Sequence, residues 1–188
     1  MKAPCERHRP GPAARAAARL GGKVPVLDTR RLQLRGPRIY DFDAYAAILC
    51  SDRAQYMGGP FTRAQAWSDF TNYTALWLLH GHGLWTIDAQ VAPSAGFALL
   101  GYEYDDPEAE LGIFLTEAVE GQGIAQEALE AVRDHAFGAL NWDSVVSYVD
   151  PLNTRCIALM ERVGARLDTA AMETLEATLV YRHERGAA

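Results

Sequence analysis

The sequence predicts one globular domain of the mixed α+β class. Its 188 residues are 49% hydrophobic, which is enough for a single core. Strand-like and helix-like patterns follow one another in the order strand, two helices, three strands, helix, strand, helix, and a last strand or strand pair. A glycine-bearing turn at residues 120–125 joins a buried strand to a helix. Together these observations indicate a sheet flanked by helices.

The first elements follow from alternation and helix-start patterns. Apolar and polar residues alternate at 30–35, which predicts an edge strand. Asp41 is expected to cap a helix whose apolar residues recur at helical spacing. Thr62 and Gln65 match the capping-box pattern T-x-x-Q and predict the start of a second helix.

The later elements are marked by apolar runs between turn residues. A turn is expected near residues 93–94, and apolar spacing at i, i+4 predicts the helix after the glycine-bearing turn. The expected strands are 84–87, 97–104, 109–116, 145–149 and 175–181, and the expected helices begin at 124 and 154.

Cysteine use and hydropathy indicate a cytoplasmic protein. Cys5, Cys50 and Cys156 are odd in number and widely spaced, which suits a reducing compartment better than a disulfide framework or a metal site. No apolar run approaches the length of a membrane span, and no signal segment opens the chain. We therefore expect no metal and no membrane partner.

Charge is divided unevenly along the chain. Residues 1–38 hold ten Lys and Arg against two acids, about +8, whereas the remainder holds eight Arg against 22 acids, about −14. An acidic body disfavours nucleic acid and favours cationic partners such as amines or basic peptides. A solvated acidic surface explains the same composition.

Residues 1–27 are rich in Ala, Arg, Pro and Gly and have no periodic apolar pattern. They are predicted to be a flexible basic N-terminal extension of a domain at 28–188. An RNA-contacting arm and an organelle presequence are alternatives. The oligomeric state is left open, with a homodimer as one option.

The turn Glu120-Gly121-Gln122-Gly123-Ile124-Ala125 has the properties of an anion cradle. Small residues expose several backbone N–H groups at the positive end of a helix dipole, where a phosphate or pyrophosphate binds. A nucleoside-triphosphate loop would need a GK[ST] ending, and no lysine lies nearby. A dinucleotide fingerprint would need a small residue at Gln126.

The cradle resembles the acetyl-coenzyme A motif of the GNAT superfamily of N-acetyltransferases, Q/R-x-x-G-x-G/A, with Gly123 and Ala125 at the small positions. The segments 149–156 (VDPLNTRC) and 161–164 (ERVG) are similar to the second half of that pattern. With 31–35 (RLQLR) and 56–59 (YMGG), the resemblance extends over roughly residues 28–182, and the branch that it indicates is RimJ/RimL-like.

This resemblance implies a curved, mostly antiparallel mixed sheet that splays open between its fourth and fifth strands, where acetyl-CoA binds as co-substrate. Glu120 departs from the family Gln or Arg and is expected to point away from the pyrophosphate. Arg162 is expected on the same helix face as Arg155. The implied cofactor-binding residues are Ile113, Phe114 and Leu115 beside the thioester, Gln122, Gly123, Ile124 and Ala125 at the pyrophosphate, and Asn153 and Arg155. Asn153 is expected either to contact the pantetheine arm or to cap a helix.

Glu110 is the leading candidate for the catalytic base. It opens an apolar strand on the same face as Gly112, where burial would raise its pKa. The alternative is a strand-end glutamate paired with an arginine, and water could serve an α-amine. The reserve candidates are His82, Asp88, Tyr102 and Glu103.

The catalytic acid is assigned to Cys156. Many members of the family place a tyrosine where this chain has Met160, and the RimJ/RimL-like branch commonly has a serine where this chain has Cys156. A thiol can donate a proton to the leaving thiolate, although a small packed cysteine fits the same position.

The expected function is acetyl-CoA-dependent N-acetyl transfer to a primary amine of a protein N-terminus, a peptide or a small molecule, by direct attack on the thioester. The alternative is a catalytically silent acyl-CoA-binding or sensor domain. It is motivated by the departures at Glu120, Met160 and Cys156. A third option is an RNA-associated factor that works through the basic extension.

Overall fold

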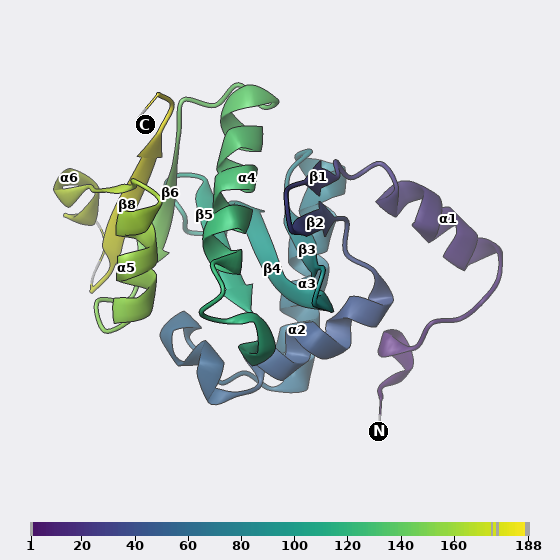
Figure 1. Cartoon of the computed structure of the whole chain (residues 1–188). Coiled ribbons are helices and arrows are strands. Elements are labelled where there is room, and N and C mark those ends of the chain that lie inside the picture. The colour runs from purple at the N-terminus through teal and green to yellow at the C-terminus, as the bar shows by residue number, and fades with distance from the viewer. Residues whose placement is uncertain (1, 174, 176, 187–188) are drawn as a thin grey trace.

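The computed structural model describes residues 2–173, 175 and 177–186 (Figure 1). Within them one sheet has eight strands in the order β1-β2-β3-β4-β5-β6-β8-β7, all antiparallel to their neighbours except β5 and β6. The strands are β1 (Leu27–Asp28), β2 (Leu32–Arg35), β3 (Leu84–Ala89), β4 (Ala92–Gly101), β5 (Glu110–Leu115), β6 (Ser144–Val149), β7 (Arg166–Leu167) and β8 (Leu179–Glu184). The predicted α+β class and the mostly antiparallel mixed sheet are confirmed.

Six α-helices and four short 3₁₀ helices connect these strands in the described part of the chain. The α-helices are α1 (Pro12–Gly21), α2 (Phe42–Leu49), α3 (Arg63–Leu79), α4 (Ile124–Gly138), α5 (Thr154–Arg162) and α6 (Thr169–Met172). The 3₁₀ helices are η1 (Pro4–Glu6), η2 (Ile39–Asp41), η3 (Asp52–Met57) and η4 (Glu117–Val119). None of these described helices combines the length and the apolarity needed to cross a bilayer.

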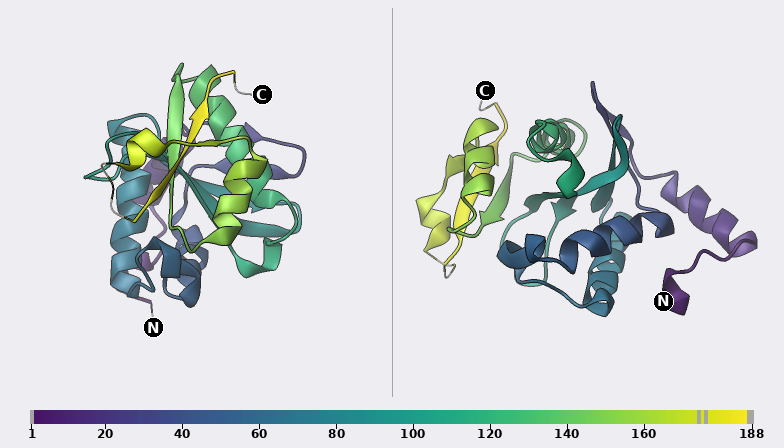
Figure 2. Two further views of the ribbon diagram at one scale, coloured as in Figure 1. Left: turned by 90° about the vertical axis from the view of Figure 1, so that its left-hand side faces the viewer. Right: turned by 60° about the horizontal axis from the view of Figure 1, so that its bottom comes forward.

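The sheet is covered on both faces, so the core has two layers. Helices α4 and α5 pack on one face, and α2 and α3 pack on the other (Figure 2). Side chains of β4 alternate between the layers: Ala98 and Leu100 join the α4 layer, whereas Phe97 and Leu99 join the α2 layer. This explains the continuous apolar run of β4, because a strand buried on both faces needs no polar face.

Strands β5 and β6 run parallel and separate almost at once. They pair at one position, Glu110 with Val146, whereas β5 pairs with β4 over six positions and β6 with β8 over six. The Val146 N–H donates to the carbonyl oxygen of Ala109 at 2.9 Å, and the strands diverge beyond it (Figure 1). The splay expected between the fourth and fifth strands is present. These two strands are numbered β5 and β6 because the short strand β1, which was not expected, precedes them.

Several element boundaries differ from expectation. Strand β4 ends at Gly101 instead of 104, because the Asp106 carboxylate accepts a hydrogen bond from the Glu103 N–H at 2.7 Å and turns the chain. The turn before β4 lies at residues 90–91. The last strand begins at Leu179 and not at 175, and residue 176 of the expected strand lies outside the described residues.

Of the caps expected for α2 and α3, only that of α3 is formed. Thr62 and Gln65 make the predicted capping box of α3. Asp41 makes no cap hydrogen bond to α2, because its buried carboxylate accepts hydrogen bonds from the Arg38 N–H at 2.7 Å and from Arg35 at 2.8 Å. The Arg35 guanidinium competes successfully for this carboxylate, since an unpaired buried charge would be costly.

The N-terminal segment touches the domain at both of its ends, through residues 2–6 and through residues 24–27, where the Trp85 Nε1 donates to the Pro25 carbonyl oxygen at 2.8 Å. Glu6 is buried and pairs with Arg63 at 2.7 Å, and Lys2 pairs with Asp43. Helix α1 has no buried side chain and projects away from the sheet (Figure 1). The flexibility expected for residues 1–27 stays a prediction.

Candidate active site

The turn between β5 and α4 presents a row of free backbone donors. Gly121 and Gly123 have φ angles of +71° and +75°, which favour glycine, and Gly123 is the N-cap of α4. The backbone N–H groups of residues 121–126 have no acceptor within the described part of the chain. Donors grouped at the positive end of a helix dipole form an anion-binding site.

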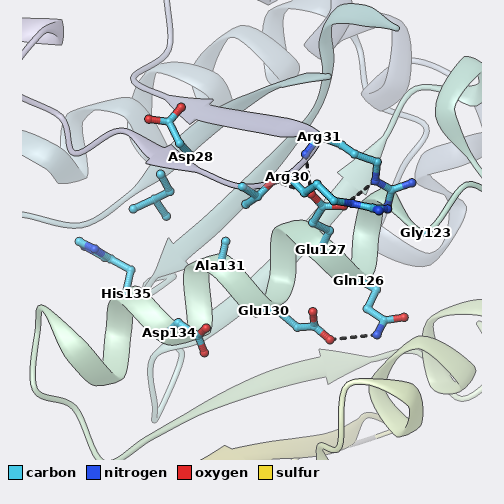
Figure 3. A pocket seen from close by; sticks show the side chains of 12 residues that line it. Asp28, Arg30, Arg31, Gly123, Gln126, Glu127, Glu130, Ala131, Asp134 and His135 are labelled. Atoms are coloured by element: carbon cyan, nitrogen blue, oxygen red, sulfur yellow. Dashed lines mark hydrogen bonds and ion pairs between the residues drawn. The ribbon is translucent and has the colours of Figure 1, made fainter. Parts of the chain in front are cut away.

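Arg31 fastens this turn to α4. Its Nε donates to Glu127 at 2.6 Å, and its Nη1 donates to the carbonyl oxygen of Gln122 at 2.7 Å. Glu127 also accepts a hydrogen bond from the Thr29 hydroxyl at 2.6 Å. Residues 27–31 and the adjoining face of α4 border a groove of about 880 Å³ (Figure 3). Arg31 therefore positions the cradle, a role not predicted from the sequence.

A cleft of about 790 Å³ lies beside the cradle and the diverging part of β5. Its walls come from β5, the cradle turn, α5, and the segment from α2 to η3. The expected cofactor-binding residues that line it are Ile113, Phe114, Leu115, Gly123, Ile124, Ala125, Asn153 and Arg155. Gln122 is exposed and outside this lining, and its side-chain amide donates to the Ala118 carbonyl oxygen at 3.1 Å.

Two comparisons place this arrangement of sheet, turn and cleft among known proteins. The family model described as the acetyltransferase (GNAT) domain matches residues 31–166. The crystal structure of an acetyltransferase from Agrobacterium tumefaciens str. C58 is 38% identical, covers 87% of this chain and 96% of its own, and has a TM-score of 0.82. The chain belongs to the GNAT acetyltransferase family.

More distant GNAT structures share the fold. RimL, a ribosomal L7/L12 α-N-protein acetyltransferase in complex with coenzyme A, is 19% identical over 87% of this chain and 100% of its own, with a TM-score of 0.69. A Salmonella typhimurium enzyme that modifies the N-terminal serine of L7/L12 is 17% identical over 86% and 99%, with a TM-score of 0.69. The expected GNAT family is confirmed, and RimL proteins are among its neighbours in fold.

Glu110 lies where the GNAT sheet splits. It is half-buried, and its Oε1 is 3.4 Å from the position that a Cβ on Gly112 would occupy, so the carboxylate lies over that residue. Burial raises the pKa of Glu110 to about 8, and the charges of Glu103 and Asp106 add to this increase. No described residue forms a hydrogen bond or ion pair with its carboxylate. The alternative, a strand-end glutamate paired with an arginine, is therefore wrong.

Asn153 is the N-cap of α5 and Cys156 lies in its first turn. Both residues line the cleft, whereas Glu110 is not among the lining residues. The Oδ1 of Asn153 accepts a hydrogen bond from the Cys156 N–H at 3.1 Å, so the cap alternative is confirmed. Burial raises the pKa of the Cys156 thiol to about 11, and the charge of Glu110 contributes. The two candidate catalytic groups therefore interact electrostatically, although one lies on β5 and the other on α5.

Glu120, at the first cradle position, is paired with two arginines. Arg155 of α5 lies 2.6 Å from its carboxylate, and Arg53 of η3 also contacts it. Partial burial raises the pKa of Glu120, but hydrogen bonds from Arg155 and Arg53 outweigh this, and the pKa lies below its usual value. Arg53 was missed by sequence reasoning because its partner lies 67 positions away.

The side of the split that faces α3 is acidic. The Tyr73 hydroxyl donates to Glu103, and the charge of Glu110 contributes to a raised pKa of Tyr73 that is due mainly to burial. Burial also raises the pKa of Asp69, with a further contribution from Glu103. The charges of Glu103 and Asp106 also act on Glu110 at the start of β5.

The reserve candidates for the base have other environments. Asp88 pairs with Arg35 at 2.6 Å, and the Nδ1 of His82 lies 2.9 Å from the carbonyl oxygen of Leu100. Tyr102 is exposed. Glu103 lies close enough to the split for its charge to raise the pKa of Glu110.

Proposed function

We propose that this GNAT protein transfers the acetyl group of acetyl-CoA to a primary amine, either the α-amine of a protein N-terminus or the amine of a small molecule. The observation that carries this proposal is the unpaired Glu110 carboxylate at the split, with its pKa of about 8. A base works best when its pKa is near the operating pH. The surrounding carboxylates favour a protonated amine as the approaching partner.

Acetyl-CoA fits the cleft through donors that the protein leaves free. The backbone N–H groups of 121–126 would bind the pyrophosphate, with Gln122, Gly123, Ile124 and Ala125 supplying most of them. The side-chain NH₂ of Asn153 has no acceptor among the described residues and would bind the pantetheine arm, while Arg155 would approach a phosphate. Beyond the junction, β5 is not paired with β6, so the backbone at residues 113–115 can donate to the thioester oxygen.

The chemistry proposed is direct attack. Glu110 removes a proton from the ammonium, and the neutral amine nitrogen then attacks the thioester carbonyl carbon. The C–S bond breaks, CoA leaves as the thiolate, and the new amide nitrogen releases its second proton, which protonates that thiolate through solvent. Cys156 is protonated at neutral pH because its pKa is about 11, so its S–H can hydrogen-bond the leaving thiolate. Complete proton transfer from Cys156 would be uphill, since an ordinary thiol has a pKa of about 8.5. An acyl-cysteine intermediate is disfavoured for the same reason, because little thiolate is present.

A two-stage experiment tests this function. Calorimetric titration with acetyl-CoA, CoA and adenosine 3′,5′-bisphosphate measures occupation of the cleft. Release of CoA thiol is then followed with N-terminal peptides, lysine peptides and small amines. Binding followed by amine-dependent thiol release is expected, and absence of binding would overturn the proposal.

A silent acyl-CoA-binding domain is the second candidate. It is favoured by Met160, which is buried in the core in place of the family tyrosine. The same assay separates the two functions, because this candidate expects tight binding of acetyl-CoA without thiol release from any amine.

A further inference from the structure

Three charged side chains from distant parts of the chain meet at the wall of the cleft. Glu120 belongs to the cradle turn, Arg53 to η3 and Arg155 to the first turn of α5, and all three line the cleft. The Arg155 Nη2 lies 2.6 Å from Glu120 Oε2, while the Arg53 Nη2 contacts Glu120 Oε1. One carboxylate therefore holds two arginines, each through a different oxygen.

Arg53 is not fully satisfied by this pairing. Its Nη2 also donates to the Leu115 carbonyl oxygen at 3.3 Å. Its Nε is buried and has no hydrogen-bond partner among the described residues. A buried guanidinium N–H without an acceptor is costly, so the contacts with Glu120 and Leu115 do not satisfy Arg53 completely.

Glu120 lines the cleft, contrary to the expectation that it would point away from a bound pyrophosphate, and its position conflicts with an anionic ligand. Its own carboxylate lies at the first residue of the turn whose next N–H groups are free. A phosphate on those groups would be repelled by Glu120 and attracted by both arginines. Because a carboxylate and a phosphate present similar oxygens to a guanidinium, the two anions compete for the same donors.

We propose that Arg53 and Arg155 are ligands of a cofactor phosphate, and that Glu120 holds them in the empty protein and competes with that phosphate. Binding exchanges the two arginine–carboxylate pairs for arginine–phosphate pairs. Glu120 thereby limits the affinity for acetyl-CoA and for the product CoA. This inference rests on the proposed use of the cleft for acetyl-CoA.

The test compares Glu120→Gln with the wild type in calorimetric titrations with CoA. The variant keeps the shape of the side chain and removes the competing charge, so CoA should bind about tenfold more tightly. Glu117→Gln is the matched control, because Glu117 is an exposed acid in the preceding η4 and does not line the cleft. This control should leave the affinity unchanged.

The arginines give a second, independent measurement. Arg53→Gln and Arg155→Gln should each weaken CoA about tenfold or more, but leave pantetheine, which has no phosphate, unaffected. Titrations with dephospho-CoA identify which phosphate is involved. If Glu120→Gln does not fold, these two variants test the phosphate contacts, and Glu120→Ala, which also removes the competing charge, tests the competition.

The outcomes are distinguishable from failure of the proposed function. A wild-type protein that binds no CoA contradicts the proposed function itself. A wild type that binds CoA, together with a folded Glu120→Gln variant of equal or weaker affinity, overturns only the competition. Arginine variants that weaken CoA and pantetheine equally would show that these residues support the fold and not the phosphate.

Discussion

The hydroxyl of Ser147 donates a hydrogen bond to the carbonyl oxygen of Leu111 at 2.6 Å, directly beyond the point where β6 leaves β5. The same Oγ lies 3.1 Å from the Nε2 of His183. Because the single hydroxyl proton goes to Leu111, the ring is the donor in this second bond. Burial, with a contribution from the Arg133 charge, lowers the pKa of His183 to about 4, so the ring is neutral. A side chain thus replaces the strand-to-strand hydrogen bond that the split removes.

Ser147→Ala should destabilise the protein by about 1–3 kcal/mol, because the buried Leu111 oxygen and His183 N–H would both lose a partner. Urea denaturation at neutral pH measures this difference. Ser68→Ala is the matched control, since Ser68 is exposed on α3 and bonds only within its helix. Equal effects of the two substitutions would contradict the role of Ser147 at the split.

Glu110→Gln should lower kcat by about tenfold or more and move the remaining activity to higher pH, because the amine must then lose its proton without a base. In the wild type, kcat should rise with pH until Glu110 is ionised, at about pH 8. Profiles of kcat against pH with saturating substrates measure both effects. An unchanged profile would remove Glu110 as the base, and Glu117→Gln should behave as the wild type.

The same substitution should alter stability in a pH-dependent way. The pKa of Glu110 rises from 4.5 to about 8 on folding, so the folded state holds more protons between these values. The extra bound proton stabilises the folded wild type at low pH. This stabilisation is lost from the free energy of unfolding as pH rises between the two pKa values. Glu110→Gln lacks it and should gain stability relative to the wild type between about pH 5 and pH 9. Urea denaturation of the wild type and of Glu110→Gln at both pH values measures the difference in their free energies of unfolding. A difference that does not change with pH would contradict the raised pKa of Glu110.

Glu103→Gln should move the rising limb of the kcat profile to lower pH. The charge of Glu103 is the second cause of the raised pKa of Glu110, after burial. Removing it should lower that pKa but leave it above the ordinary value, because burial is the largest cause and persists. Asp105→Asn is the control, since Asp105 is an exposed acid on the same loop and does not contribute to this shift. A similar displacement in both variants would indicate a general effect of net charge.

Gly123→Glu should abolish CoA binding. A side chain there must adopt a φ of +75°, its Cβ would lie 3.3 Å from Arg31 Nη2, and its charge would repel a phosphate. Gly138→Glu, at the other end of α4 where the added Cβ meets open space, should bind CoA as the wild type does. Retained affinity in Gly123→Glu would mean that the ligand phosphates bind elsewhere.

Much of the fold follows from local patterns. Alternation and helical spacing depend on neighbouring residues, so they located the strand at Glu110, the helix at Ile124 and the capping box at Thr62. The resemblance of the cradle and of segment 149–156 to GNAT motifs then supplied the expectation of a mostly antiparallel mixed sheet that splays open. Side-chain contacts set by the tertiary structure were missed, as at Asp41, which is the N-cap residue of α2 as expected but whose carboxylate is taken by Arg35.

The sequence by itself determined the class of the fold, the glycine turn before α4 and its likeness to an acetyl-CoA cradle, because these depend on residues close together in the chain. Only the tertiary structure decided which charges meet. It brought Glu120 to Arg53, Glu103 near Glu110, and Ser147 to Leu111. A pKa and an ion pair depend on burial and on neighbours from other elements, and these exist only once the sheet and its helices are packed.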